Sequence, residues 1–185
     1  TRTAHNASQG LGERDGRFPD WEGSVWDTVH HRAMRNAACT TIAPTGSISI
    51  LANCSSGIEP LFSLAYRRRA LDDKEFIAVH PLLEDLGARQ GWMNQRVREA
   101  LLEGIPPRKI RGFPDRLAGV LVTAHDVAPE WHVRIQAAFQ ENIDNAVSKT
   151  VNLPASAAVE DVDRIFRMAY DLGCKGITVY RDGSR

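Results

Sequence analysis

The chain has 185 residues, enough for one domain with a buried core, and its 43% hydrophobic and 25% charged residues are close to the average of globular proteins. Lys plus Arg and Asp plus Glu both number 23, so the zero formal net charge excludes a broad attraction to nucleic acid or anionic lipid. No apolar run approaches the roughly 20 residues of a membrane span, and the polar N-terminus predicts no secretory signal peptide.

The three cysteines, Cys39, Cys54 and Cys174, are scattered and include no Cys-x-x-Cys pair. This usage predicts a reducing, cytoplasmic compartment. The six histidines offer no zinc-ligand spacing, so we expect no structural metal. The chain begins at Thr1 and ends on polar residues, and we expect it to be a piece of a longer protein.

The first quarter of the chain is predicted to be poor in regular structure. Residues 1–24 are polar and glycine-rich and read as a loop with at most short ordered pieces. Residues 24–36 allow a short helix with a poor apolar face. The β-branched run from Cys39 to Ala43 predicts a strand that stops at Pro44.

The middle of the chain alternates short apolar and charged stretches. Residues 61–67 are compatible with a strand or a helix, and periodicity does not decide between them. Residues 71–92 suggest two short helices. Asn94 is placed to cap a helix that ends at Gly104, and Asp115 to cap another.

The last third carries the clearest pattern. Pro129 suits the first turn of a helix, and the alternating run 146–153 predicts a strand. The stretch 159–172 predicts an amphipathic helix that ends before Gly173, and 176–180 a second strand. Strand, helix and strand in this order predict a βαβ unit with parallel strands, a right-handed crossover and an α/β fold. The apolar stripe of the helix at Pro129 is expected to comprise Trp131, Ile135, Ala138, Phe139 and Ile143.

We therefore predict a single domain over residues 25–185, preceded by the polar, loop-rich segment 1–24. Its most informative stretch follows Pro44, where small hydroxyl residues and a glycine open a helix. Such a helix start brings together backbone N–H groups, hydroxyl donors and the positive end of a helix dipole. This combination can bind a phosphate without Lys or Arg. The alternative is an ordinary Ser/Thr-capped helix start, and no Walker A lysine follows. The candidate phosphate-binding residues are Thr45, Gly46, Ser47, Ile48 and Ser49.

Two other polar groups are candidates for a site. The loop from Cys54 to Pro60 could line a pocket; its alternative is a tight surface turn with a buried, inert thiol. Polar residues also surround the strand at 146–153, either facing a pocket or lying on an exposed face. Tyr180 lies at the end of the last strand. It is either a radical or hydrogen-bonding group or a half-buried packing residue. The polar residues beside the strand are Asn145, Lys149 and Asn152.

Several stretches resemble ribonucleotide reductases in the expected order along nearly the whole chain. Residues 35–49 resemble the strand and phosphate loop of the large subunit, and 54–60 resemble the Gly-Ile-Glu-Pro stretch that follows it. Tyr180 followed by Arg181 departs from the tyrosine pair of the two-subunit enzymes, which favours the adenosylcobalamin-dependent class. The further stretches that resemble this class are 18–24, 132–140, 145–154 and 173–185.

This resemblance implies the second half of a ten-stranded α/β barrel built from two five-stranded parallel halves. The implied reaction replaces the 2′-hydroxyl of a ribonucleoside diphosphate by hydrogen, giving deoxyribonucleotides for DNA synthesis. It uses a cysteine thiyl radical that adenosylcobalamin generates in the full-length enzyme. The loop at 45–49 would bind the substrate phosphates.

The resemblance also implies what this chain lacks. The radical and reducing-pair cysteines of the family lie upstream, none of Cys39, Cys54 and Cys174 matches them, and we expect the chain alone to be inactive. Its implied partners are the substrate and the rest of the same polypeptide, with self-assembly left open and with neither nucleic acid nor membrane. The alternative is a non-enzymatic nucleotide- or phosphate-binding or interaction module with a half-barrel fold.

Overall fold

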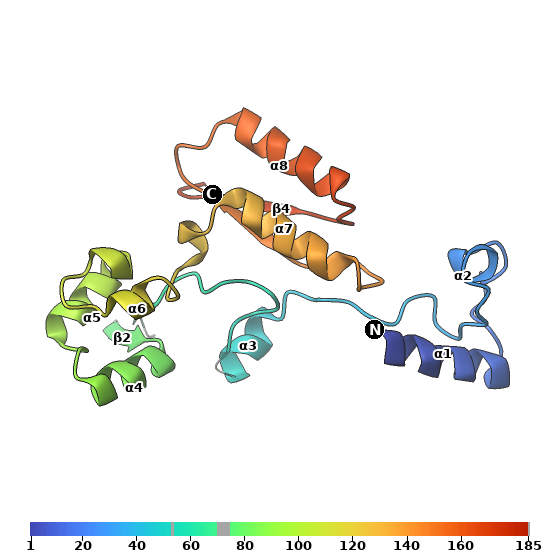
Figure 1. Cartoon of the computed structure of the whole chain (residues 1–185), viewed down its shortest axis with the longest axis horizontal. Helices are drawn as coiled ribbons and strands as arrows, with labels where there is room; N and C mark the ends of the chain where they lie inside the picture. The colour runs from blue at the N-terminus through green and yellow to red at the C-terminus, as the bar shows by residue number, and fades with distance from the viewer. Residues whose placement is uncertain (53, 70–74, 185) are drawn as a thin grey trace.

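The computed structural model describes residues 1–52, 54–69 and 75–184. Figure 1 shows an α/β chain in several groups, with α1 and α2 at one end, a lobe around α4, α5 and α6 at the other, and α7, α8 and β4 between and above them. Within the described ranges, no helix is both long and apolar enough to cross a membrane.

The regular elements are as follows. The helices are α1 (Arg2–Asp15), α2 (Val25–Thr28), α3 (Gly46–Ala52), α4 (Pro81–Gln90), α5 (Gln95–Leu102), α6 (Asp115–Ala118), α7 (Pro129–Gln140) and α8 (Val159–Asp171). The strands are β1 (Ala65–Arg69), β2 (Glu75–Val79), β3 (Thr150–Leu153) and β4 (Thr178–Arg181). Two 3-10 turns are η1 (Pro107–Lys109) and η2 (Ala124–Asp126).

The prediction of a loop over residues 1–24 is wrong for the part of this segment that forms α1. One of the glycines that suggested a loop serves packing instead, because a Cβ on Gly12 would lie 1.9 Å from the carbonyl oxygen of Ala33. Ser8, one turn earlier, is buried, and its carbonyl accepts the N–H of Arg35 at 3.0 Å. Small residues at positions i and i+4 thus let the backbone of a later segment lie directly on the helix. The short helix expected after residue 24 is limited to α2.

The strand expected from Cys39 to Ala43 is reduced to one parallel bridge, between Ile42 and Val147. The carbonyl of Ile42 accepts the N–H of Ser148 at 2.8 Å, and that of Thr40 accepts the N–H of Asn145 at 3.0 Å. The segment therefore runs beside the start of the β3 region without forming a full ladder.

A separate hydrophobic cluster holds the lobe, which we define as the described residues between Leu61 and Ala124. Strands β1 and β2 pair antiparallel, with Ala65 opposite Val79, and α4 and α5 pack beside them. Of the undecided stretch 61–67, residues 65–67 thus belong to a strand. Of the two helices expected over 71–92, α4 forms and the other is replaced by β2, while 71–74 lie outside the described residues. The buried cluster includes Leu64, Leu83, Trp92, Val97, Leu101 and Phe113.

The two caps predicted in the lobe have different outcomes. The Asn94 side chain accepts the N–H of Val97 at 3.1 Å, so the cap of α5 is confirmed. The cap predicted at Asp115 is wrong, because Pro114 occupies the N-cap and Asp115 is the first residue of the helix. This helix ends at Ala118, since the chain turns at Gly119.

The predicted βαβ unit is confirmed in its elements and in its parallel pairing. Thr150 lies opposite Thr178 and Leu153 opposite Arg181. Helix α8 ends as expected, with Gly173 in the left-handed region at φ 73°. Helices α7 and α8 pack against each other, and side chains of both join those of β3 in one core. The core between them includes Val133, Val151, Leu153, Ile165 and Ala169.

The apolar stripe predicted for α7 faces solvent and not the core. Trp131 is 64% exposed and Ile135 44%, whereas Gln136 is fully buried. The Gln136 amide donates to the carbonyls of Val147 at 3.1 Å and Gly176 at 2.6 Å. These carbonyls precede the strands and need a partner, because a buried backbone acceptor is costly to leave unpaired. The inner face of α7 therefore carries buried polar side chains beside the apolar Val133 and Ala137.

Candidate functional site

The predicted phosphate loop lies at the start of α3. Its first intrahelical bond runs from the N–H of Ser49 to the carbonyl of Thr45 at 2.9 Å. The three preceding N–H groups, of residues 46–48, therefore have no intrahelical acceptor. Ser47 and Ile48 are exposed, whereas Ser49 is buried and its hydroxyl donates to the Gly46 carbonyl at 2.7 Å. The loop thus presents backbone donors and one exposed hydroxyl.

The first two residues of this loop have unusual surroundings. A Cβ built on Gly46 meets no atom within 4 Å, so the backbone there borders open space. Thr45 has φ 49°, a left-handed conformation that is uncommon for a β-branched residue. Its hydroxyl oxygen accepts the N–H of Gly57 at 3.0 Å and lies 3.4 Å from that of Ser56. Strain held by neighbouring contacts in this way is typical of functional loops.

The second candidate loop packs against the first. Besides the contact of Gly57 with Thr45, the Ser56 hydroxyl donates to the carbonyl of Pro44. The Cys54 side chain is exposed, so the buried thiol considered as an alternative is wrong. The stretch that resembles the family's phosphate loop and the stretch that resembles its Gly-Ile-Glu-Pro segment are therefore adjacent in space.

Behind these loops lies a buried ionic cluster formed by Glu59, Lys149 and His132. The Lys149 side chain has no exposed surface, and its ammonium donates to Glu59 Oε2 at 2.6 Å, to His132 Nδ1 at 2.7 Å and to the Thr150 carbonyl. Three donors thus meet three acceptors. The other oxygen of Glu59 accepts the N–H of Thr150 at 2.5 Å. Glu59 therefore fastens the second loop to β3.

Burial is the largest influence on the pKa values of Lys149 and His132 in this cluster. Burial lowers the pKa of Lys149, and the hydrogen bond and charge of Glu59 oppose that shift. Burial, followed by the charge of Lys149, lowers the pKa of His132. A neutral His132 accepts at Nδ1 from Lys149 and donates from Nε2 to the Ala124 carbonyl at 3.0 Å. The chain of contacts joins the second loop, β3, α7 and η2.

A cavity of about 450 Å³ adjoins Glu59 on the sheet face away from α7 and α8. Alternate residues of each strand point to the same face, which brings Asn152 of β3 and Tyr180 of β4 to its wall. Of the polar residues noted beside this strand, Lys149 thus supports the wall and Asn152 forms part of it. Asn145 is exposed on the preceding turn and does not join them.

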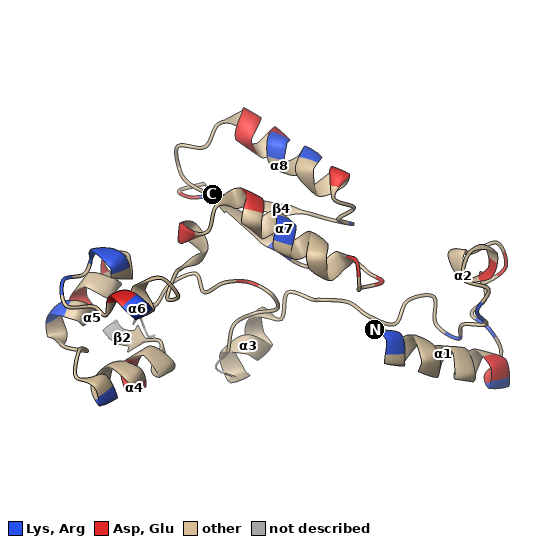
Figure 2. Cartoon of the chain, in the orientation of Figure 1, with Lys and Arg blue, Asp and Glu red and all other residues tan. Residues whose placement is uncertain are grey.

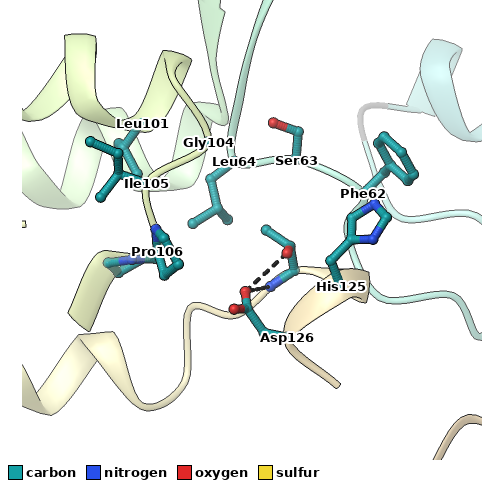
Figure 3. A pocket seen from close by; sticks show the side chains of 11 residues that line it. Phe62, Ser63, Leu64, Leu101, Gly104, Ile105, Pro106, His125 and Asp126 are labelled. Carbon is teal, nitrogen blue, oxygen red and sulfur yellow. Dashed lines mark hydrogen bonds between the residues drawn. The ribbon is translucent and has the colours of Figure 1, made fainter. Parts of the chain in front are cut away.

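A second cavity, of about 260 Å³, lies where the lobe joins the rest of the chain (Figure 3). Burial would raise the pKa of Asp126, but hydrogen bonds from the backbone and hydroxyl of Thr123, both 2.9 Å, and the charge of Arg108 hold it below its ordinary value. The Ser63 hydroxyl donates to the Ala65 carbonyl. Because these polar groups already have hydrogen-bond partners within the protein, we assign no ligand to this cavity.

His5, Cys39 and Asp144 form a group with metal-ligand chemistry, their ligand atoms lying within 4.8 Å of one another. Asp144 accepts the N–H groups of Cys39 at 2.7 Å and Thr40 at 3.2 Å, and bonds His5 Nε2 at 2.8 Å. Burial would raise the pKa of Asp144, but these bonds lower it overall. Hydrogen bonding accounts for the arrangement, which fastens α1 to the turn before β3, so we assign no metal to it.

Comparisons with known proteins agree over nearly the whole chain. The family described as "Ribonucleotide reductase, barrel domain" matches residues 1–180. A vitamin B12-dependent ribonucleoside-diphosphate reductase of Thermoplasma acidophilum is 45% identical over 98% of this chain and 23% of its own length. A protein of the same name from Mycobacterium tuberculosis (strain CDC 1551) is 43% identical over 100% of this chain and 26% of its own. The chain thus spans about a quarter of the length of these relatives.

The fold also matches a solved structure. The Actinobacillus ureae class Id ribonucleotide reductase alpha subunit superposes with a TM-score of 0.74 at 24% identity. The match covers 97% of this chain and 32% of that subunit. At this identity, the likeness shows a shared fold.

Proposed function

Because the chain belongs to the ribonucleotide reductase barrel-domain family, we propose that it is the substrate phosphate-binding part of a vitamin B12-dependent ribonucleoside-diphosphate reductase. The family and the barrel fold predicted from the motifs are both confirmed. The intact protein would convert ribonucleoside diphosphates to deoxyribonucleotides. Two relatives at 43% and 45% identity, both named for that activity and for vitamin B12, support the proposal.

The proposed phosphate site is the loop at the start of α3. The observation that carries it is the set of N–H groups at residues 46–48, which precede the first intrahelical bond and lie beside the open space at Gly46. Such groups bind anions without a cationic side chain. The Ser47 hydroxyl adds a donor, while Thr45 and Ser49 hold the loop in shape.

The cofactor proposed for the intact protein is adenosylcobalamin, which supplies a radical by homolysis of its carbon–cobalt bond. We assign no residue of this chain to the cofactor.

We propose that this chain contributes no catalytic cysteine. Burial raises the pKa of the Cys174 thiol, which keeps it protonated and unreactive. Cys39 lies beside the structural Asp144 contact, and Cys54 is exposed. Three free thiols also support a reducing, cytoplasmic location.

The test is Gly46→Val in the intact protein, measured by equilibrium binding of cytidine diphosphate (CDP). A branched side chain at Gly46 occupies the space a phosphate would use, so we expect an affinity loss of roughly tenfold or more, the equivalent of one charged hydrogen bond. Gly119→Val is the control, because its Cβ also meets no atom within 4 Å. Unchanged CDP affinity in Gly46→Val would remove the loop from the site.

A further inference from the structure

Glu59 is the only charged residue between Ala43 and Pro60, the stretch that contains both loops of the proposed phosphate site. Figure 2 shows α3 without a charged residue. A site proposed for a polyanion therefore has a carboxylate as its one formal charge along this stretch. A lone carboxylate beside a phosphate site repels the ligand.

We propose that Lys149 is a positioning residue that compensates the charge of Glu59 and thereby sets the affinity of the site for the substrate's phosphates. This inference rests on the proposed function. Lys149 cannot act by touching a ligand, because its side chain is fully buried and its three N–H groups are occupied. Its effect passes through Glu59.

The geometry links Glu59 to the phosphate loop by a short path. The N–H of Glu59 donates to the Ser56 carbonyl at 2.9 Å, and Gly57 between them donates to Thr45 at 3.0 Å. The Glu59 side chain is 25% exposed and forms part of the cavity wall. Its partly exposed carboxylate thus belongs to a residue two positions from a direct contact with the loop, and on this path its charge acts on an anion bound there.

The energetics also suit a role in binding. A buried ion pair stabilises a fold little, because both charges lose their hydration, and an apolar pair of similar volume often serves as well. Removing one partner is different, since it leaves the other charge uncompensated. The pair can therefore be tested with a series of variants that changes its net charge and nearly keeps the shape of the cavity wall.

The test compares Lys149→Met, Glu59→Gln and the double variant in the intact protein at pH 8, with cytidine, cytidine monophosphate and CDP as probes. Lys149→Met leaves one negative charge, and we expect CDP affinity to fall roughly tenfold, the monophosphate less and cytidine unchanged. The double variant is neutral and should restore CDP affinity to within about threefold of wild type. The loss should shrink as salt is added.

An equal loss for all three probes, or a double variant as weak as Lys149→Met, would show a structural role alone and overturn the inference. If Lys149→Met does not fold, Glu59→Gln should still bind CDP more tightly than the double variant, and equal affinities would be contrary evidence. Failure of Gly46→Val to weaken CDP binding would instead count against the proposed function. The two failures are therefore distinguishable.

Discussion

The lowered pKa of His132 makes stability depend on pH. A histidine whose folded pKa lies below its unfolded value, near 6.5, takes up a proton more readily in the unfolded chain. Its contribution is complete above the unfolded pKa and is lost as pH falls from there towards the folded pKa. We expect the free energy of unfolding to decline below pH 6.5, by at most about 1.4 kcal/mol per pH unit for this one proton.

Urea unfolding between pH 7.5 and 5 measures that decline. His132→Gln keeps a donor and an acceptor without titrating, so its profile should be flatter over the same range. Asp144 does not affect stability in this pH range. A carboxylate with a lowered pKa loses its contribution to the free energy of unfolding only as pH falls below its ordinary pKa of 3.8. Identical slopes for wild type and His132→Gln would contradict the assignment.

A second prediction at this scale concerns the cap of α5. Asn94→Ala removes the acceptor of the Val97 N–H and should cost about 1 kcal/mol of unfolding free energy. Gln95→Ala, next to it and on the exposed surface, is the control and should change little. Chemical denaturation of the two variants decides the point.

At the residue scale, the sequence predicted local features and missed distant ones. The Asn94 cap and Gly173 depend on neighbours within one helical turn, and both were predicted. The contact of Lys149 with Glu59 joins residues 90 positions apart, so no spacing rule could reveal it. The left-handed Thr45 was also hidden, because a β-branched residue seldom adopts that conformation.

At the scale of elements, α1 offers a matched pair of glycines. A Cβ on Gly12 would collide with the backbone of residues 33–35, whereas one on Gly10 meets no atom within 4 Å. Gly10→Ala should therefore raise the free energy of unfolding by about 0.5–1 kcal/mol through helix propensity. Gly12→Ala should lower it, because the packed segment must move. Thermal and urea unfolding of both variants test this, and equal effects would be inconsistent with the packing described.

Elements were predicted well where one face packs on a core, and poorly where polar contacts replace it. The pattern of α8 is amphipathic, and its Ile165 and Ala169 are buried in the core, although the apolar Val159 and Phe166 stay exposed. In α7 the buried face carries Gln136 and Gln140, which satisfy backbone carbonyls. Hydrophobic periodicity cannot indicate such a face, because its partners are backbone atoms of other segments.

At the scale of the whole molecule, the exposed apolar stripe of α7 predicts self-association of the 185-residue chain expressed alone. Trp131, Ile135 and Phe139 are 64%, 44% and 39% exposed, and in the part of the chain that the structure describes the β3–β4 sheet has two strands. Apolar patches and unpaired strand edges favour contact between copies. We expect light scattering to give a mass above the 20.5 kDa of one chain, rising with concentration.

Replacing Trp131 and Phe139 together by Gln should shift that mass towards the monomer. A single chain that stays monomeric at every concentration and unfolds cooperatively at high temperature would contradict the expectation. The overall arrangement in Figure 1 was beyond sequence reasoning, because the lobe and the βαβ unit have separate cores that no local pattern relates.

The junction of the lobe has a consequence for protein engineering. The N–H of Ala124 donates to the carbonyl of Leu61 at 2.8 Å, and the rings of Phe62 and His125 meet edge to face at 4.9 Å. The lobe is therefore a segment whose entry and exit lie in contact. A segment of this kind can be shortened, lengthened or replaced by a tight turn while the segments on either side keep their positions. Changes in chain length during evolution should concentrate there, leaving Glu59 and Lys149 in contact.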